Sequence, residues 1–186
     1  LGLKDLNLPR NSLDLVKDSA ILFENVPFYG MYMPDGIASH TINGVPYVFS
    51  ANEGDVTEWP GVRGNGSTIG AMKGSLAPNS PAALFLAGKT TYDGVEVASD
   101  MGSNSIYMYG GRSFSIWQAD TMTQVYDSGN EFEKATAQRV PNNFNTSNSK
   151  TALDDRSSKK GPEPEDIKVG KVGSKILAFV GLERVG

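Results

Sequence analysis

An internal repeat of two segments constrains the fold of this chain more than any other feature of its sequence. The repeat consists of "MPDGIASHTINGVPYVFSANEGD", which starts at Met33, and "EPEDIKVGKVGSKILAFVGLERV", which starts at Glu163, and the two align without a gap, with Pro34 on Pro164. In both, a strand with apolar residues at alternating positions leads through a glycine-containing turn into a more apolar strand, which ends in small residues and a glutamate. Each segment therefore predicts a β-hairpin.

The spacing of the repeat favours a β-propeller over a β-sandwich. Each hairpin has the pattern of the inner half of a propeller blade, and blades of roughly 40 to 50 residues would place three blades between the two copies. Between them, Ser113–Trp117 and Gln124–Tyr126 predict two further strands, which would form an outer-blade hairpin. We therefore expect an all-β fold, a β-propeller, in which residues 1–186 form a single partial domain that supplies about three to four blades of a larger ring.

Other stretches predict short strands and surface loops. Val95–Ala98 and Ser105–Tyr109 have the composition of strands, whereas Glu131–Gln138 is short and fits a helix or an edge strand equally well. Residues 56–92 are rich in Gly, Ser, Ala and Pro, and residues 141–164 begin Asn- and Ser-rich and become charged. We expect both of these stretches to be loop excursions on the surface.

A chain that supplies only some of the blades needs a partner to complete the propeller, because few propellers close with fewer than about four blades. The missing strands are expected to come from the rest of a longer polypeptide, from a second processed chain, or from another copy of this chain. The start at Leu1, without an initiator methionine or a leader, likewise predicts a processed mature chain or a fragment.

Composition excludes several classes of protein. The chain has 17 basic and 21 acidic residues, a net charge of −4 and no basic cluster longer than Lys159-Lys160, so nucleic acid is not an expected partner. No stretch approaches the roughly 18 consecutive apolar residues of a membrane span, so we expect none. The absence of cysteine excludes disulfides and thiolate metal sites.

Two N-glycosylation sequons favour a secreted, extracellular glycoprotein. They begin at Asn65 and Asn145, and both lie in Gly-, Ser- and Asn-rich sequence of the kind found in exposed loops. A glycan would be accessible to the modifying enzyme there. We therefore predict glycosylation at Asn65 and Asn145.

Five ordered motifs make the chain resemble a known family. The motifs "YVFSANEGD", "GGRSFSIW", "VYDSGNEFE", "DDRSSKKGPEPE" and "AFVGLERVG" resemble those of the choice-of-anchor I domain family, which includes mesenchyme-specific cell surface glycoproteins and bacterial proteins often labelled alkaline-phosphatase-like. The resemblance runs from about Tyr29 to Gly186 and departs from the family pattern between Val56 and Asp100. It implies an extracellular β-propeller.

Acidic residues at the predicted strand ends are the candidate metal ligands. The inner strands of a propeller converge on a central channel, so carboxylates at their ends can face and repel one another. A Ca²⁺ ion with roughly six to eight oxygen ligands would relieve that repulsion without Cys or His. The alternative is that Glu53 and Glu183 pair with Arg112, Arg156 or Arg184 in buried ion-pair networks. The candidate ligands are Glu53, Asp55, Glu163, Glu165 and Glu183.

Soft and aromatic side chains are candidates for an apolar ligand, such as a polyene pigment or a lipid. Packing in the core or between blades is the alternative for such side chains. The residues concerned are Met31, Tyr32, Met33, Tyr107 and Tyr109.

These patterns together predict a secreted, calcium-stabilised β-propeller glycoprotein that acts as a binding or extracellular-matrix module without catalysis. One alternative is a carrier of an apolar small molecule. The other is a metal-dependent phosphoesterase, for which Arg112 would be a candidate phosphate ligand. Bound pigment or lipid would indicate the carrier, and hydrolysis of a phosphate ester would indicate the enzyme.

Overall fold

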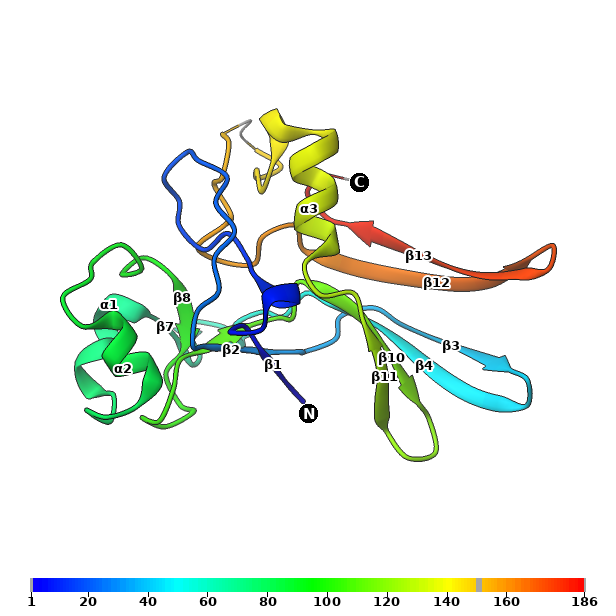
Figure 1. Ribbon diagram of the computed structural model, residues 1–186, viewed down its shortest axis with the longest axis horizontal. Coiled ribbons are helices and arrows are strands. Elements are labelled where there is room, and N and C mark those ends of the chain that lie inside the picture. The colour runs from blue at the N-terminus through cyan, green and yellow to red at the C-terminus, as the bar shows by residue number, and fades with distance from the viewer. Residues whose placement is uncertain (1, 150–151, 186) are drawn as a thin grey trace.

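The computed structural model describes residues 2–149 and 152–185, which form a mostly β structure of antiparallel sheets with few helices. Figure 1 shows the long strands on one side of the molecule and the two shortest α-helices on the other. The strands are β1 Leu3–Asp5, β2 Tyr29–Met31, β3 Ile37–Ile42, β4 Val45–Asn52, β5 Glu58–Trp59, β6 Val62–Arg63, β7 Gly66–Thr68, β8 Glu96–Ala98, β9 Tyr107–Tyr109, β10 Ser113–Gln118, β11 Thr123–Asp127, β12 Pro164–Val172 and β13 Lys175–Leu182. The α-helices are α1 Ile69–Met72, α2 Pro81–Leu86 and α3 Glu131–Arg139, and short 3-10 helices cover Pro9–Asn11, Lys73–Ser75 and Pro141–Asn143.

The largest sheet has four antiparallel strands in the order β3-β4-β10-β11, which is also their order along the chain. This confirms the hairpin predicted from Met33 and the outer hairpin predicted from Ser113. The register pairs Ser113 of β10 with Asn52 of β4. The sheet is therefore an up-and-down meander, interrupted between its second and third strands by the segment 53–112.

The second copy of the repeat forms the hairpin β12-β13, as predicted. It lies over the first hairpin, as Figure 1 shows, and its Ile167 packs with Phe49 and Ala51 of β4 in a shared apolar cluster. The amide of Gly36 donates a hydrogen bond of 2.7 Å to the carbonyl of Glu165, which ties the start of β3 to β12. The two copies of the repeat are thus stacked face to face.

The prediction of three to four blades is not confirmed. Among the described residues, one sheet is a four-stranded meander, one sheet has three strands (β1-β2-β9), and three sheets have two strands each. The chain between the two copies of the repeat completes only one four-stranded meander, because a long insertion within that meander separates β4 from β10. That insertion carries β5 to β9, α1 and α2. No closed propeller or barrel is formed by the described part of the chain.

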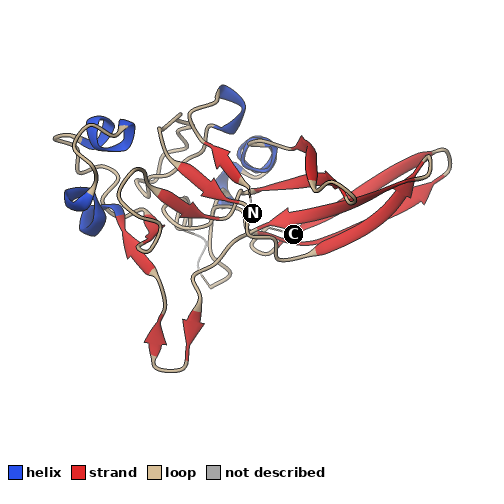
Figure 2. Cartoon of the chain, turned by 90° about the horizontal axis from the view of Figure 1, so that it is seen from below, coloured by secondary structure: helices blue, strands red, loops and turns tan. Residues whose placement is uncertain are grey.

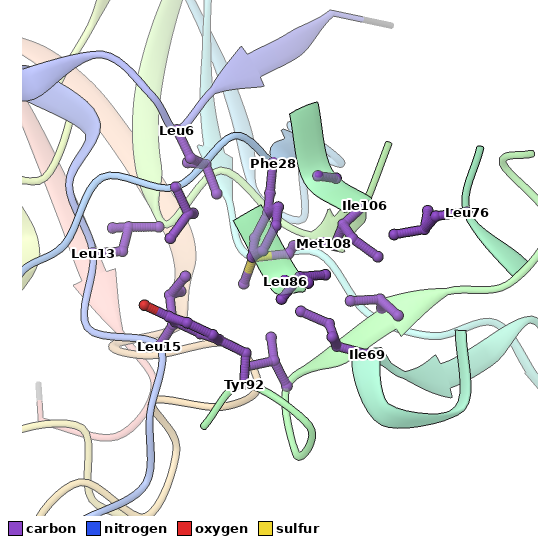
Figure 3. Close-up of a cluster of buried hydrophobic side chains, with 14 residues drawn as sticks. Leu6, Leu13, Leu15, Phe28, Ile69, Leu76, Leu86, Tyr92, Ile106 and Met108 are labelled. Atoms are coloured by element: carbon purple, nitrogen blue, oxygen red, sulfur yellow. The ribbon is translucent and has the colours of Figure 1, made fainter. Parts of the chain in front are cut away.

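The stretch 56–92, which we expected to be a loop excursion on the surface, is exposed over residues 57–61 but contributes short helices to the main apolar core further along. Thr68 caps α1 by accepting a hydrogen bond from the amide of Ala71, and Ser80 caps α2 by accepting one from Ala83. These helices bury Ile69 and other apolar side chains in the cluster of Figure 3, whose members point toward one another. The cluster comprises Leu6, Leu13, Leu15, Val26, Phe28, Ile69, Leu76, Ala82, Leu86, Tyr92, Val95, Val97, Ile106 and Met108.

The segment 141–164 is also partly internal. It consists mainly of turns, yet it buries Phe144, Asn145, Asp154 and Glu163 completely or almost completely. The ambiguous stretch at residue 131 is helix α3, which follows directly after the large sheet and lies beside this segment. Figure 2 shows that the long strands extend away from the helical side of the molecule. In the described residues no helix is long and apolar enough to cross a membrane.

Candidate functional site

Three of the five predicted metal ligands meet where the stacked hairpins end. Glu53 follows β4, Glu183 follows β13, and Glu163 precedes β12, so stacking of the hairpins brings the three side chains together. One carboxylate oxygen from each lies within 4.8 Å of the others. The amide of Glu183 also donates a 2.8 Å hydrogen bond to the carbonyl of Glu163, which fixes the two strand ends side by side. We call these three residues the glutamate cluster.

The other two predicted ligands do not join the glutamate cluster. Glu165 is exposed on β12. Asp55 is also mainly exposed, and its carboxylate accepts a hydrogen bond of 3.0 Å from the Nζ atom of Lys160. The prediction of a five-carboxylate site was therefore too broad.

Three cations neutralise the glutamate cluster. Lys160 forms an ion pair with Glu53, and its Nζ atom lies 3.6 Å from Glu163. Arg156 also pairs with Glu163. Arg184 lies between two of the glutamates, with its Nη2 atom 2.8 Å from Glu163 and 2.8 Å from Glu183.

This pairing sets the proton affinities of the glutamates. Burial alone would raise the pKa of Glu163, but the hydrogen bonds that its carboxylate accepts and the charge of Lys160 outweigh burial and lower the pKa to about 2. The hydrogen bond between the two carboxyl groups, followed by burial, raises the pKa of Glu183 to about 7. Burial also raises the pKa of Glu53 despite its contact with Lys160. Glu163 is thus ionised at neutral pH, while Glu183 shares a proton with it.

The geometry matches the ion-pair alternative for Arg184, which pairs with Glu183, whereas Arg156 pairs with Glu163 instead. Lys160, a cation that the sequence reasoning had not placed here, completes the neutralisation. A Ca²⁺ ion among the three glutamates would meet repulsion from all three cations, which already satisfy the carboxylate oxygens. Calcium at the glutamate cluster stays a prediction.

Arg112, a candidate partner for these glutamates or for phosphate, instead lies beside helix α3. Its side chain is buried and forms an ion pair of 2.8 Å with Glu133 of α3. Its remaining nitrogen contacts are to the carbonyls of Asp14, Ser157 and Lys159. A guanidinium enclosed in this way cannot receive a phosphate from solvent.

A polar cavity adjoins the glutamate cluster and has a volume of about 220 Å³. Its wall carries both signs of charge, so it suits a polar or zwitterionic group better than a simple anion. The cavity is lined by Asp55, Glu96, Tyr109, Arg156, Lys159, Lys160 and Arg184.

The predicted apolar-ligand residues separate into two places. Met31, Met33 and Tyr107 pack against a small buried cluster that includes Tyr109, so for these four the core-packing alternative holds. Tyr32 instead contacts Trp117 edge to face, at 5.5 Å between ring centroids, beside an apolar groove of about 430 Å³. The groove is lined by Gly2, Tyr32, Pro34, Ile37, Val48, Ser50, Trp117 and Met122.

The two sequons have different environments. The side chain of Asn65 is partly exposed, although it contacts Asp100 and Tyr109. Asn145 is only 1% exposed, and its Nδ2 atom, to which a glycan would be attached, donates a 2.9 Å hydrogen bond to Ser157. The attachment atom of Asn145 is therefore enclosed in this structure, and glycosylation at Asn65 and Asn145 stays a prediction.

Comparisons with known proteins give one matching family and two similar proteins. The model of the choice-of-anchor I domain matches residues 1–186. Gigasin-3a of Magallana gigas is 41% identical over 88 residues, which are 45% of this chain and 31% of that protein. The mesenchyme-specific cell surface glycoprotein of Strongylocentrotus purpuratus is 35% identical over 106 residues, which are 50% of this chain and 14% of that protein. The matches thus cover less than a third of either relative, and no solved structure is significantly similar to the chain.

Proposed function

Because this chain belongs to the choice-of-anchor I domain family, we propose that it supplies one complete blade and the inner half of the next blade to an extracellular β-propeller that acts as a binding module. The complete blade is the meander β3-β4-β10-β11, and β12-β13 begins the next one. Four antiparallel strands in chain order are the unit from which propellers are built.

The observation that carries this proposal is the opposite burial of equivalent residues in the two hairpins. Ile167 is 0% exposed, whereas Ile37, its equivalent in the first hairpin, is 66% exposed. Phe49 is 3% exposed, whereas its equivalent Phe179 is 60% exposed. Each hairpin therefore buries one apolar face and leaves Ile37 or Phe179 exposed on the other, although Ser50 and Asn52, which share a face with Ile37, are also buried. The exposed residues are at opposite ends of the stack.

This pattern is the signature of head-to-tail stacking. The face of β12-β13 that contains Ile167 covers the face of the first sheet that contains Phe49. By the same contact, the face that contains Ile37 would cover a preceding blade, and a following blade would cover Phe179. A heterologous contact that repeats closes into a ring when its rotation divides a full turn evenly, without a shift along the axis.

The apolar groove lies on the uncovered face that contains Ile37, because Val48, Ser50 and Trp117 share that face. We therefore assign the groove to contact with a neighbouring blade. A carrier of an apolar molecule is the second candidate function, since a groove of about 430 Å³ with a mainly apolar lining would accept one. Pigment or lipid that copurifies with the chain would favour the carrier.

Binding without catalysis fits the charged groups better than phosphoester hydrolysis does. A metal-dependent hydrolase needs an ion with an open coordination position. The glutamates that would hold such an ion are paired with Lys160, Arg156 and Arg184. Arg112 is buried in its own ion pair.

The extracellular location is supported by the similarity of the chain to the mesenchyme-specific cell surface glycoprotein of Strongylocentrotus purpuratus. Expressed behind a secretion leader in animal cells, the chain should reach the medium with one glycan, attached at Asn65. Endoglycosidase treatment and the variant Asn65→Gln should each remove the added mass, whereas Asn145→Gln should leave it in place. Intracellular retention of an unglycosylated chain would contradict the proposal.

A further inference from the structure

A second group of buried charges lies away from the glutamate cluster, beside helix α3. It joins the N-terminal segment, α3 and the turns that precede β12. The side chains of this group are 0% or 1% exposed. We call it the α3 polar cluster, and it comprises Asp14, Arg112, Glu133, Asn145 and Asp154.

The α3 polar cluster contains three carboxylates and one cation. Arg112 neutralises Glu133, and no ion pair among the described residues involves Asp14 or Asp154. Their carboxylates accept hydrogen bonds only from main-chain amides, at 3.0 Å from Leu22 to Asp14 and at 2.7 Å from Asp18 to Asp154 among them. Two buried carboxyl groups thus lack a cationic partner, an arrangement that is costly inside a protein when such groups are ionised.

Two oxygens of the cluster also find no hydrogen-bond donor in the described part of the chain. They are Oδ1 of Asn145 and Oδ1 of Asp154, and both are buried. The Nδ2 atom of Asn145 donates to Glu133 at 3.4 Å and to Ser157 at 2.9 Å, so the amide of Asn145 is held beside the other members of the cluster. The amide of Asp154 donates to the carbonyl of Phe144 at 2.9 Å, which holds Asp154 beside Asn145. A buried acceptor without a partner costs about 1 to 3 kcal/mol, and an ion is one of the partners that removes this cost.

We propose that the α3 polar cluster binds one calcium ion, with oxygen ligands from Asp14, Asn145 and Asp154. Carboxylate and amide oxygens are hard ligands of the kind that calcium takes, together with main-chain carbonyls and water. Glu133 is a positioning residue, because it is held by Arg112 and in turn orients the amide of Asn145.

The amide of Asp14 donates a 2.9 Å hydrogen bond to the carboxylate of Glu133, so the N-terminal segment is held against α3. A bound ion would also join three parts of the chain that are distant in sequence, namely the N-terminal segment, α3 and the turns before β12.

The test is thermal unfolding of the full chain after treatment with a chelator, with and without added calcium chloride. Asp154→Asn removes a ligand charge, and Glu183→Gln in the glutamate cluster is the matched control. We expect calcium to raise the Tm of the wild-type chain and of Glu183→Gln, and to leave the Tm of Asp154→Asn unchanged. Calorimetric titration should give one calcium ion per wild-type chain.

A second variant keeps the test decisive if Asp154→Asn does not fold. Asn145→Asp adds a ligand charge, so it should lower the Tm of the calcium-free chain and enlarge the increase that calcium produces. No calcium effect on the wild-type chain would overturn the inference, because the cluster would then be neutralised by a proton. An effect abolished by Glu183→Gln but kept in Asp154→Asn would also overturn it, and would place the ion in the glutamate cluster.

Discussion

At the scale of single residues, buried charged side chains and their partners determine much of the stability of this chain. Replacing Arg112 by Met removes the partner of a fully buried Glu133. An uncompensated buried charge of this kind costs about 3 to 5 kcal/mol. Urea denaturation should show a loss of that size in the free energy of unfolding.

The matched control for Arg112→Met is Lys168→Ala. The ion pair between Lys168 and Asp166 has side chains that are 75% and 57% exposed. Exposed pairs contribute little to stability because solvent screens them, so this variant should unfold almost like the wild-type chain. Equal losses in the two variants would show that the Arg112 pair is not buried in solution.

The raised pKa of Glu183 predicts that the stability of the folded chain depends on pH. Its pKa in the folded chain is about 7, above the ordinary value of 4.5. The stability it contributes is therefore full below about 4.5 and is lost as the pH rises toward 7. Asp14 acts in the same direction, since its pKa rises from 3.8 to about 7. Glu163, with a pKa lowered to about 2, contributes stability that is lost only as the pH falls below 4.5.

Glu183→Gln keeps a hydrogen-bond donor next to Glu163 but removes the titration. The decline of Tm between pH 4.5 and pH 7 should therefore be smaller in Glu183→Gln than in the wild-type chain, without vanishing, because Asp14 still titrates. Glu165→Gln, on the exposed part of β12, should follow the wild-type curve. Superimposable curves for wild type and Glu183→Gln would refute the assignment.

Sequence reasoning reached the glutamates and two of their cations, Arg156 and Arg184, but not Lys160. Glu53 and Glu183 occupy equivalent positions of the repeat, and strand ends of stacked hairpins must converge, so their meeting could be predicted. Lys160 is brought to the glutamates by a turn-rich segment, and the sequence of that segment has neither helical nor strand periodicity. The only sequence signal was a basic pair shortly before Glu163.

At the scale of elements, the joint between the insertion and the meander depends on glycine. Gly110 has φ +76°, and a Cβ atom there would lie 1.7 Å from the carbonyl oxygen of Glu53. Gly110→Ala would thus force the end of β4 away from the chain that leads into β10. Gly44, with φ +82° and no atom within 4 Å, offers a control with backbone strain alone.

Gly44→Ala should cost about 1 kcal/mol or slightly more, from the positive φ angle. Gly110→Ala should cost several times as much, because strain and a main-chain clash act together. Chemical denaturation of the two variants separates these effects. Similar losses would mean that the close approach between the insertion and β4 does not exist in solution.

The elements differ in how well sequence pattern revealed them. The hairpins were predictable because alternating apolar residues and a glycine turn leave little choice of structure. Helices α1 and α2 have only 4 and 6 residues, too few for a helical period to emerge from a stretch rich in Gly, Ala and Pro. The N-cap residues Thr68 and Ser80 were the sequence features that could have indicated where these two helices begin.

At the scale of the whole molecule, the expected number of blades is not confirmed. The separation of the two repeat copies, divided by an ordinary blade length, gives three blades, but an insertion within one blade gives the same separation. The two cases differ in where apolar residues of the intervening stretch lie. Here they build a separate core from the insertion and the N-terminal segment, which no repeat marks in the sequence.

Sedimentation velocity of two face-blocking variants tests the head-to-tail stacking of blades most directly. Ile37→Asp blocks one uncovered face and leaves Phe179 intact, whereas Phe179→Asp blocks the other and leaves Ile37 intact. Each variant alone should sediment as a monomer, and an equimolar mixture should form a one-to-one complex through the two intact faces. A mixture that sediments as two monomers would contradict the account, because the uncovered faces would then not be complementary.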